Sequence, residues 1–143
     1  MPIRPEVRRF YSTKAWREVR QRVLQRAGYR CEQCCVPDES RVFRRRDKPG
    51  WWTLYGEAHD SQGKCWAKDQ PVLVTQMRLV KIVLTIAHLD RVPGNDDEEN
   101  LKALCQWCHL AYDRAVNVRN SHVTRATRKD AERPLQWNES IVV

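Results

Sequence analysis

Four cysteines in two closely spaced pairs are the first residues in this sequence that could do chemistry. Cys31 and Cys34 form one Cys-x-x-Cys pair, and Cys105 and Cys108 form a second pair much further along the chain. A two-residue spacer lets both thiolates of a pair point at one ion, and two pairs complete the sulfur ligands of a tetrahedral structural zinc site. We therefore predict that these four residues bind Zn²⁺, with the fold bringing the two pairs together.

The other two cysteines lack this spacing. Cys35 is adjacent to Cys34 and could replace it as a ligand, although its distance from Cys31 in the sequence fits less well. Cys65 has no partner motif, and we expect it to be a free or partly buried thiol. The first residues contain no apolar stretch of the kind that a secretory signal needs, so we expect the reducing cytoplasm, where cysteines serve metal or redox chemistry before disulfides.

A second group of polar residues lies around the second cysteine pair. His88 and Asn100 precede the pair, and His109 and Asp113 follow it, within the segments IAHLD at 86–90 and CQWCHLAYD at 105–113. In this region the chain resembles the HNH endonuclease family, in which a strand-end His, an Asn and a His at the start of a helix make up a ββα-metal motif, also called a His-Me finger.

The resemblance covers residues 10–35, which include the segment YSTKAWR at 11–17, and residues 80–116. It implies an α+β fold: a small zinc-stabilised ββα-metal domain with an N-terminal helix and an insertion of loops and strands. We treat residues 1–143 as a single nuclease domain. Its parts are the N-terminal helix with the first zinc knuckle, the insertion, the ββα-metal core and a basic C-terminal tail, at residues 10–35, 36–78, 79–120 and 121–143.

The family's reaction, hydrolysis of a phosphodiester bond, needs an activated water and positive charge at the phosphate and the leaving oxygen. Because an imidazole titrates near neutral pH, His88 at the end of a strand is the candidate general base. The resemblance implies that His109 binds the catalytic divalent ion, Mg²⁺ or another cation. Asp113 lies four residues later on the same helix face and is the second candidate ligand. Asn100 would hold the loop between the strands and help to orient His88.

One position departs from the family's pattern. Many members have an Asp or His, a further metal ligand, directly before the general-base His, whereas this chain has Ala87. Asp90 or water could complete the set of ligands instead. Each of these residues also has a structural interpretation, as a core histidine, an alternative zinc ligand or a surface charge, but their order and spacing favour the functional one. His59 and His122 lack this context, and we expect both on the surface.

The candidate residues depend on a few helices and strands for their positions. Ser12 or Thr13 can cap a helix that ends near Ala27, with Gly28 directly after it. The β-branched stretches Val72–Val74 and Leu79–Ile86 predict strands, as does 101–104. A helix should follow Cys108 to about Asn120, and the tail either extends this helix or forms another. Residues 35–71 read as loops and short strands, with a hairpin near 51–58.

The charge of the chain is unevenly distributed. Residues 1–48 carry a net charge of +8, equal to that of the whole chain, while residues 86–113 are net acidic and the tail is again basic. Basic ends are typical of proteins that bind a polyanion. We expect phosphate contacts from Arg17, Arg20, Arg44, Arg45, Arg46, Lys48, Arg114 and Arg119, although a solvated surface is the alternative. Trp51 and Trp52 could stack on bases but are more typical of core residues in the insertion.

Together these patterns predict a metal-dependent endonuclease that hydrolyses DNA, in double-stranded form, in the cytoplasm of a bacterium or a phage-infected host. No segment is apolar enough to suggest a membrane partner. Two alternatives stay open. One is a non-catalytic, zinc-dependent nucleic-acid-binding module that lost its activity through Ala87, and the other is an RNA-directed nuclease. A role in a phage or a mobile element is in keeping with the resemblance.

Overall fold

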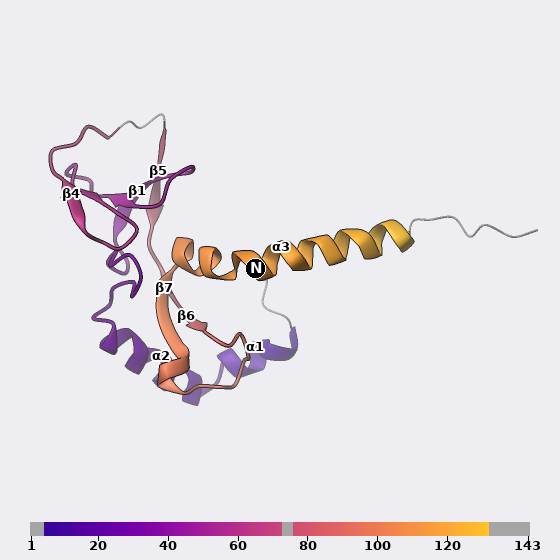
Figure 1. The fold of residues 1–143 in the computed structure, drawn as a ribbon. Coiled ribbons are helices and arrows are strands. Elements are labelled where there is room, and N and C mark those ends of the chain that lie inside the picture. The colour runs from indigo at the N-terminus through magenta and orange to yellow at the C-terminus, as the bar shows by residue number, and fades with distance from the viewer. Residues whose placement is uncertain (1–4, 73–75, 132–143) are drawn as a thin grey trace, which may run out of the picture. The chain divides into compact units, whose positions relative to one another are not determined.

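A computed structural model describes residues 5–72 and 76–131 of the chain. The chain forms two units, Met1–Leu110 and Ala111–Val143, and each is described here by itself. The first unit is a mixed α+β structure with two antiparallel sheets (Figure 1). The α+β class predicted from the sequence is therefore confirmed. The expected strand over Val72–Val74 falls largely outside the described residues.

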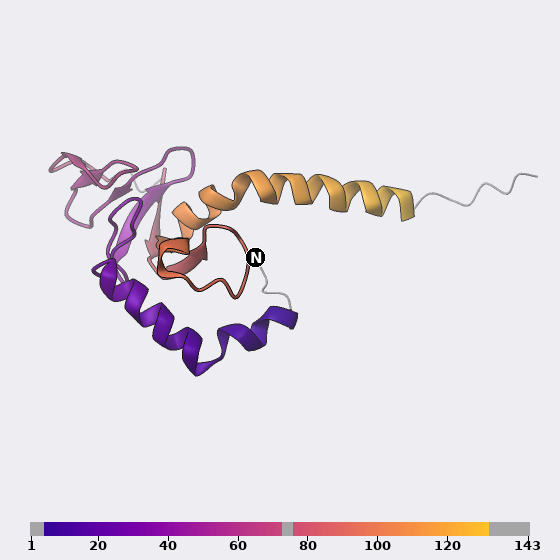
Figure 2. The same cartoon turned by 60° about the horizontal axis from the view of Figure 1, so that its bottom comes forward.

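Two helices open the first unit: α1 (Pro5–Tyr11) and α2 (Lys14–Arg26), which meet at an angle (Figure 2). The Thr13 side chain accepts a hydrogen bond from the Trp16 amide at 3.1 Å and so caps α2. At the other end, Gly28 has a positive φ of 59° and the amide of Tyr29 donates to the carbonyl of Leu24, which closes the helix in a Schellman motif. The predicted helix and both of its end signals are confirmed.

The insertion contributes to an antiparallel sheet of five short strands joined by loops, so the predicted loops and short strands are confirmed. The strands are β1 (Arg41–Arg45), β2 (Trp51–Trp52), β3 (Ala58–His59), β4 (Cys65–Ala67) and β5 (Met77–Lys81). Their order is β4-β3-β2-β1-β5, so the strand that ends the insertion pairs with the strand that begins it. The expected hairpin near 51–58 corresponds to β2 and β3 and is confirmed.

A separate two-stranded hairpin follows, made of β6 (Leu84–His88) and β7 (Leu101–Cys105). A short 3₁₀ turn (Glu98–Asn100) precedes β7, and helix α3 (Gln106–Ala131) begins directly after it. The strand structure predicted over Leu79–Ile86 is confirmed in part: β5 and β6 cover most of it, and a break at 82–83 marks where the chain passes from one sheet to the other. At the crossing, the Ile82 amide donates to the Ser40 carbonyl, and the Ile82 carbonyl accepts from the Glu39 amide.

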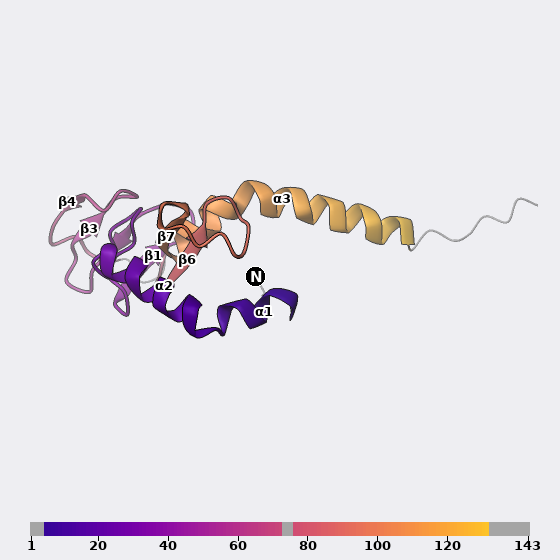
Figure 3. The ribbon, with the colours of Figure 1, turned by 90° about the horizontal axis from the view of Figure 1, so that it is seen from below.

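The core of the first unit lies between α2, the hairpin and β1. Its fully buried side chains include Val23 of α2, Leu84 and Leu101 of the hairpin, and Val36 and Ile82 of the connecting segments. Helix α2 runs beside the hairpin (Figure 3), where its arginines donate to hairpin carbonyls, Arg20 to Leu84 and Arg26 to Leu101. The hairpin is thereby fixed on one side by apolar packing and at both of its ends by hydrogen bonds.

The described part of the second unit is the continuation of α3 to Ala131. The helix starts at Gln106, slightly earlier than the sequence predicted. It continues into the tail as far as Ala131, so the first part of the tail extends this helix and does not form a second one. Its described side chains are mostly exposed, Arg114 and Arg119 among them. None of the described helices is both long and apolar enough to span a membrane.

Candidate metal centre and active site

The two cysteine pairs meet in the interior of the first unit. One ligand atom from each of Cys31, Cys34, Cys105 and Cys108 lies within 4.8 Å of all the others, and all four residues are buried. The Sγ atoms of Cys34 and Cys105 are 3.7 Å apart. Four converging thiols are a donor set that suits zinc, so these residues could hold one metal ion in a structural site.

Backbone contacts explain how distant segments bring the thiols together. The turn after α2 carries the first pair, while the end of β7 and the first turn of α3 carry the second. The Glu32 amide donates to the Ala103 carbonyl at 2.9 Å, and the Glu32 carboxylate accepts from the Ala103 amide at 2.6 Å. The Cys105 amide donates to the sulfur of Cys31 at 3.4 Å. The first knuckle is thus joined to the free edge of β7.

The thiols also interact electrostatically. Hydrogen bonds from Cys105 and then Cys108 hold the pKa of Cys31 well below its usual value and lower the pKa of Cys34 to about 6. The pKa of Cys108 is raised, mainly by its bond with Cys105. A lowered thiol pKa favours the thiolate, the form that binds metals. Cys35 is exposed and lies outside the cluster, so it does not replace Cys34.

A buried arginine accompanies the thiols. Arg44 is 6% exposed, and its Nη2 donates to the sulfur of Cys105 at 3.2 Å and to that of Cys34 at 3.5 Å. The expectation that Arg44 contacts phosphate is therefore corrected. Strand alternation places Val42 and Arg44 on the buried face of β1, so this side chain is directed into the protein.

His88 ends β6 and is buried in a box of aromatic side chains. Its ring stacks on that of Trp16, with centroids 5.3 Å apart and planes inclined by 16°, and both Phe10 and Tyr11 lie with ring centroids 6.4 Å away. The Nε2 atom is 3.1 Å from Oδ1 of Asp96. A neutral imidazole donates at only one nitrogen, so a carboxylate at Nε2 leaves the lone pair of the ring on Nδ1.

Tyr11 and His88 are both at least partly shielded from water in this aromatic box. Burial, followed by the charge of Asp96, raises the pKa of the Tyr11 phenol above its ordinary value. His88 itself is only 9% exposed. The low exposure of His88 shows that its ring is largely shielded from water, with Asp96 as its charged neighbour.

Asn100 ties together the loop between the two hairpin strands. Its side-chain oxygen accepts from the Asp90 amide at 3.0 Å, and its side-chain nitrogen donates to the Asn95 carbonyl at 2.9 Å. Its backbone carbonyl accepts from the Leu89 amide directly after His88. Hydrogen bonds from the Val92 amide, Asn100 and Asn95 hold the pKa of Asp90 below its usual value. Asp90 is thus occupied as an acceptor within the loop.

His109 lies in the first turn of α3 and contacts β6. Its Nδ1 is 2.8 Å from the Thr85 hydroxyl, which also donates to the Leu104 carbonyl. Since a hydroxyl has one proton, Thr85 accepts from Nδ1–H, and the lone pair of the His109 ring is on Nε2. Strand alternation puts Ala87 on the same face of β6 as Thr85 and puts His88 on the opposite face. Asp113, the second predicted ligand of the catalytic ion, belongs to the second unit of the chain.

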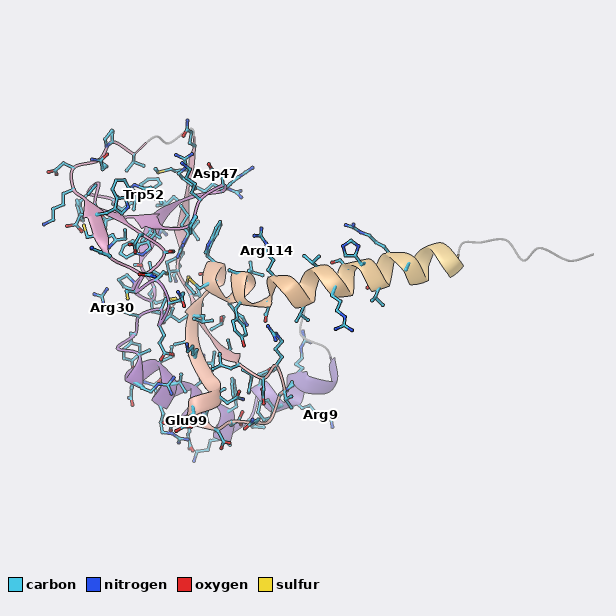
Figure 4. All side chains as sticks on the ribbon, viewed as in Figure 1. Arg9, Arg30, Asp47, Trp52, Glu99 and Arg114 are labelled. Atoms are coloured by element: carbon cyan, nitrogen blue, oxygen red, sulfur yellow. The ribbon has the colours of Figure 1, made fainter. Side chains whose placement is uncertain are left out.

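The basic residues predicted to contact nucleic acid differ in their surroundings. Arg17, Arg46, Lys48, Arg114 and Arg119 are exposed. Arg45 pairs with Asp47, which lies in the turn between β1 and β2 and is labelled in Figure 4. Arg20 is half-buried and bonded to the hairpin.

The remaining aromatic and histidine predictions can also be compared with the structure. Trp51 and Trp52 are both buried and belong to the core of the insertion. His59 stacks on Trp51 with ring centroids 3.8 Å apart, and its side chain is only 15% exposed, so its expected surface position is wrong. His122 is exposed.

Comparison with known proteins found no match: no family model, no curated protein and no solved structure matches this chain. The functional argument therefore rests on the residues themselves. Sequence reasoning missed Asp96 and Thr85 as partners of the two histidines, and it missed the aromatic box. Asp96 stands in the acidic run 96–99, where no local pattern distinguishes it from its neighbours.

Proposed function

We propose that this protein is a metal-dependent endonuclease of the ββα-metal type that hydrolyses phosphodiester bonds in double-stranded DNA. The observation that carries the proposal is the order of a strand-end histidine, a loop-closing asparagine and a helix-start histidine along one β6–β7–α3 segment. His88, Asn100 and His109 occupy these three positions.

His88 is the general base in this proposal. With Nε2–H bonded to Asp96, its Nδ1 accepts the proton of the attacking water. Asp96 then stabilises the imidazolium that forms, and the stacking on Trp16 limits rotation of the ring. Asn100 acts through the loop, because its bonds to the segments on either side fix the backbone where β6 ends.

His109 is the proposed ligand of the catalytic cation. Metal-binding histidines usually donate their second ring N–H to an oxygen acceptor, and the Thr85 hydroxyl serves this purpose at Nδ1. A divalent ion such as Mg²⁺, when bound, would neutralise charge on the scissile phosphate and its leaving oxygen. Asp113 as the second ligand stays a prediction from its spacing.

The four buried cysteines are the proposed structural zinc ligands. They join the turn after α2 to the start of α3, so a bound Zn²⁺ would hold together the segments that carry the candidate site. Exposed arginines and lysines, Arg17, Arg46, Lys48, Arg114 and Arg119, are proposed to contact DNA phosphates. Contacts of this kind position a duplex without reading its sequence.

Ala87 favours a second candidate, a zinc-dependent nucleic-acid-binding module without activity. This residue shares a face of β6 with Thr85, the partner of His109, and its methyl group offers no donor to a cation. The two candidates differ in a single measurable property, namely whether the bound nucleic acid is cleaved.

The test is a plasmid-nicking assay with zinc-loaded protein and added Mg²⁺ or Mn²⁺. We expect cleavage by the wild type and none by His88→Ala, with equal DNA binding by both. His122→Ala is the matched control, because His122 is exposed on α3, and it should cleave like the wild type. Equal inactivity of wild type and His88→Ala with binding retained would reject the enzyme in favour of the binding module. Structured RNA tested beside duplex DNA at the same salt concentration distinguishes the RNA-directed alternative.

A further inference from the structure

The five-stranded sheet contacts the first cysteine pair at several points. The Trp51 indole N–H donates to the Cys34 carbonyl at 2.8 Å. In the turn between β3 and β4, the Gln62 carbonyl accepts from the Cys35 thiol at 3.6 Å. A Cβ atom at Gly63 would lie 2.7 Å from the Cys34 carbonyl oxygen, so the backbone of that turn packs directly on the knuckle. The inserted sheet is therefore in close contact with the candidate metal centre.

Arg44 brings a charge from this sheet to the sulfur atoms. Its Nη2 reaches the thiols of Cys34 and Cys105, one from each pair, while its Nη1 donates to the Gly50 carbonyl at 3.3 Å. The guanidinium carbon lies 5.9 Å from the centre of the Trp107 ring. Among the described residues, no carboxylate lies within ion-pair distance of Arg44, and its Nε has no hydrogen-bond partner.

A buried cation needs a nearby negative charge, because removing it from water is costly. Four thiolates with one Zn²⁺ carry a net charge of about −2, which is equally unfavourable in a buried site. Because Arg44 lies against the sulfur atoms, the buried cation and the negatively charged cluster can stabilise each other. The sulfur cluster is the counterion of Arg44, and Arg44 offsets part of the charge of the loaded cluster.

We propose that the five-stranded sheet, formed by β1 to β5, forms the outer shell of the zinc site, with Arg44 as the residue that compensates the charge of the tetrathiolate. The inference rests on the zinc-binding part of the proposed function and is independent of nuclease activity. It gives the inserted segment a role: the sheet holds Arg44 against the sulfurs and covers the first knuckle.

The test compares zinc affinity in three proteins by competition with a chromophoric chelator. Arg44→Met keeps much of the length and removes the charge and the donors, and we expect it to lose about 10- to 100-fold in zinc affinity, the usual effect of removing an outer-shell partner. Arg41→Met is the matched control, because Arg41 lies on the same strand and is exposed. It should bind zinc like the wild type.

Cobalt substitution gives a second readout that packing alone would not change. Hydrogen bonds to thiolate stabilise the sulfur lone pairs, so their loss should move the sulfur-to-cobalt charge-transfer band of the Arg44 variants to longer wavelength. Arg44→Lys keeps the charge and loses the planar fork. Arg44→Lys should show the band shift with a smaller loss of zinc affinity. It also replaces Arg44→Met in the test if that variant does not fold.

The outcomes separate the two proposals. Zinc binding by the wild type, with affinity and cobalt spectrum unchanged in Arg44→Met or Arg44→Lys, would overturn the outer-shell role and leave the zinc site intact. A wild type that binds no zinc would overturn the zinc site and the outer-shell role together. Weaker binding with a shifted band in the Arg44 variants, and neither change in Arg41→Met, would establish the role.

Discussion

The contact between Asp96 and His88 makes a quantitative prediction about the reaction. The Asp96 carboxylate lies 3.1 Å from Nε2 of His88, and the two side chains are 27% and 6% exposed. When His88 accepts a proton, the ring becomes an imidazolium and its bond to the carboxylate becomes an ion pair in a largely desolvated site. Asp96→Asn keeps the shape and an oxygen acceptor, but it removes the charge that stabilises the protonated ring.

The size of the effect follows from the kind of hydrogen bond that is lost. A hydrogen bond to a charged group contributes about 1.5–3 kcal/mol. If this contribution is realised only as the ring gains its proton, it lowers the barrier by that amount, which corresponds to about a 10- to 150-fold change in rate. We therefore expect Asp96→Asn to reduce the rate of DNA cleavage within that range and to leave DNA affinity close to that of the wild type.

The assay is single-turnover cleavage of a labelled duplex at saturating protein and Mg²⁺. Asp97→Asn is the matched control, since it removes the same charge from an exposed neighbour whose backbone carbonyl accepts a hydrogen bond from the Asn100 amide. Equal losses in Asp96→Asn and Asp97→Asn would refute the role given to Asp96.

Three further predictions concern the free energy of unfolding, measured in urea with zinc present. Thr13→Ala removes the cap of α2 and should cost about 1 kcal/mol, and a cost no larger than that of Ser12→Ala would contradict the cap. Leu84→Ala empties a fully buried position and should cost about 2–5 kcal/mol; a cost below about 1 kcal/mol would mean that the hairpin is loosely packed. The lowered pKa of Asp90, caused first by the Val92 amide, adds stability that is present above the ordinary pKa of 3.8 and lost as the pH falls through the lower pKa of the folded state. Asp90→Asn should remove this part of the acid dependence, and an unchanged pH profile would show that the loop bonds do not favour the carboxylate.

Local signals made parts of the fold predictable. Helix α2 could be placed because its cap at Thr13 and its termination at Gly28 depend only on neighbouring residues. The cysteine cluster was predictable for a different reason: the two-residue spacers fix the geometry of each pair, and a tetrahedral ion needs two such pairs. In both cases the residue types leave few structural alternatives.

The strand boundary at Ile82 was not predictable in this way. A run of β-branched residues from Leu79 to Ile86 favours extended structure throughout, and both β5 and β6 are extended. What divides them is hydrogen bonding of Ile82 to Ser40 and Glu39, residues far away in the sequence. Such tertiary contacts have no periodic signature in the segment that they interrupt.

The basic run at 44–46 shows the same limit for function. The three arginines are adjacent and look equivalent in the sequence. In the structure, however, Arg46 is exposed, Arg45 pairs with Asp47, and Arg44 is buried against sulfur. Strand alternation could indicate that neighbours face opposite sides, but only the folded arrangement places the thiols beneath Arg44. A charge run therefore predicts a polyanion contact for some of its members and conceals an internal role for another.

The proposed zinc site and the proposed general base lie at opposite ends of one hairpin. Leu84 pairs with Cys105 at one end, and His88 pairs with Leu101 at the other. Four residues of antiparallel strand separate these pairs by about 14 Å, at about 3.4 Å per residue. An ion held by the thiols is thus too far away to activate a water at His88 and can act only by fixing the hairpin. Zinc removal should then unfold the site, and added Mg²⁺ should not restore cleavage to the zinc-free chain, because the cation proposed at His109 needs the start of α3 already in place.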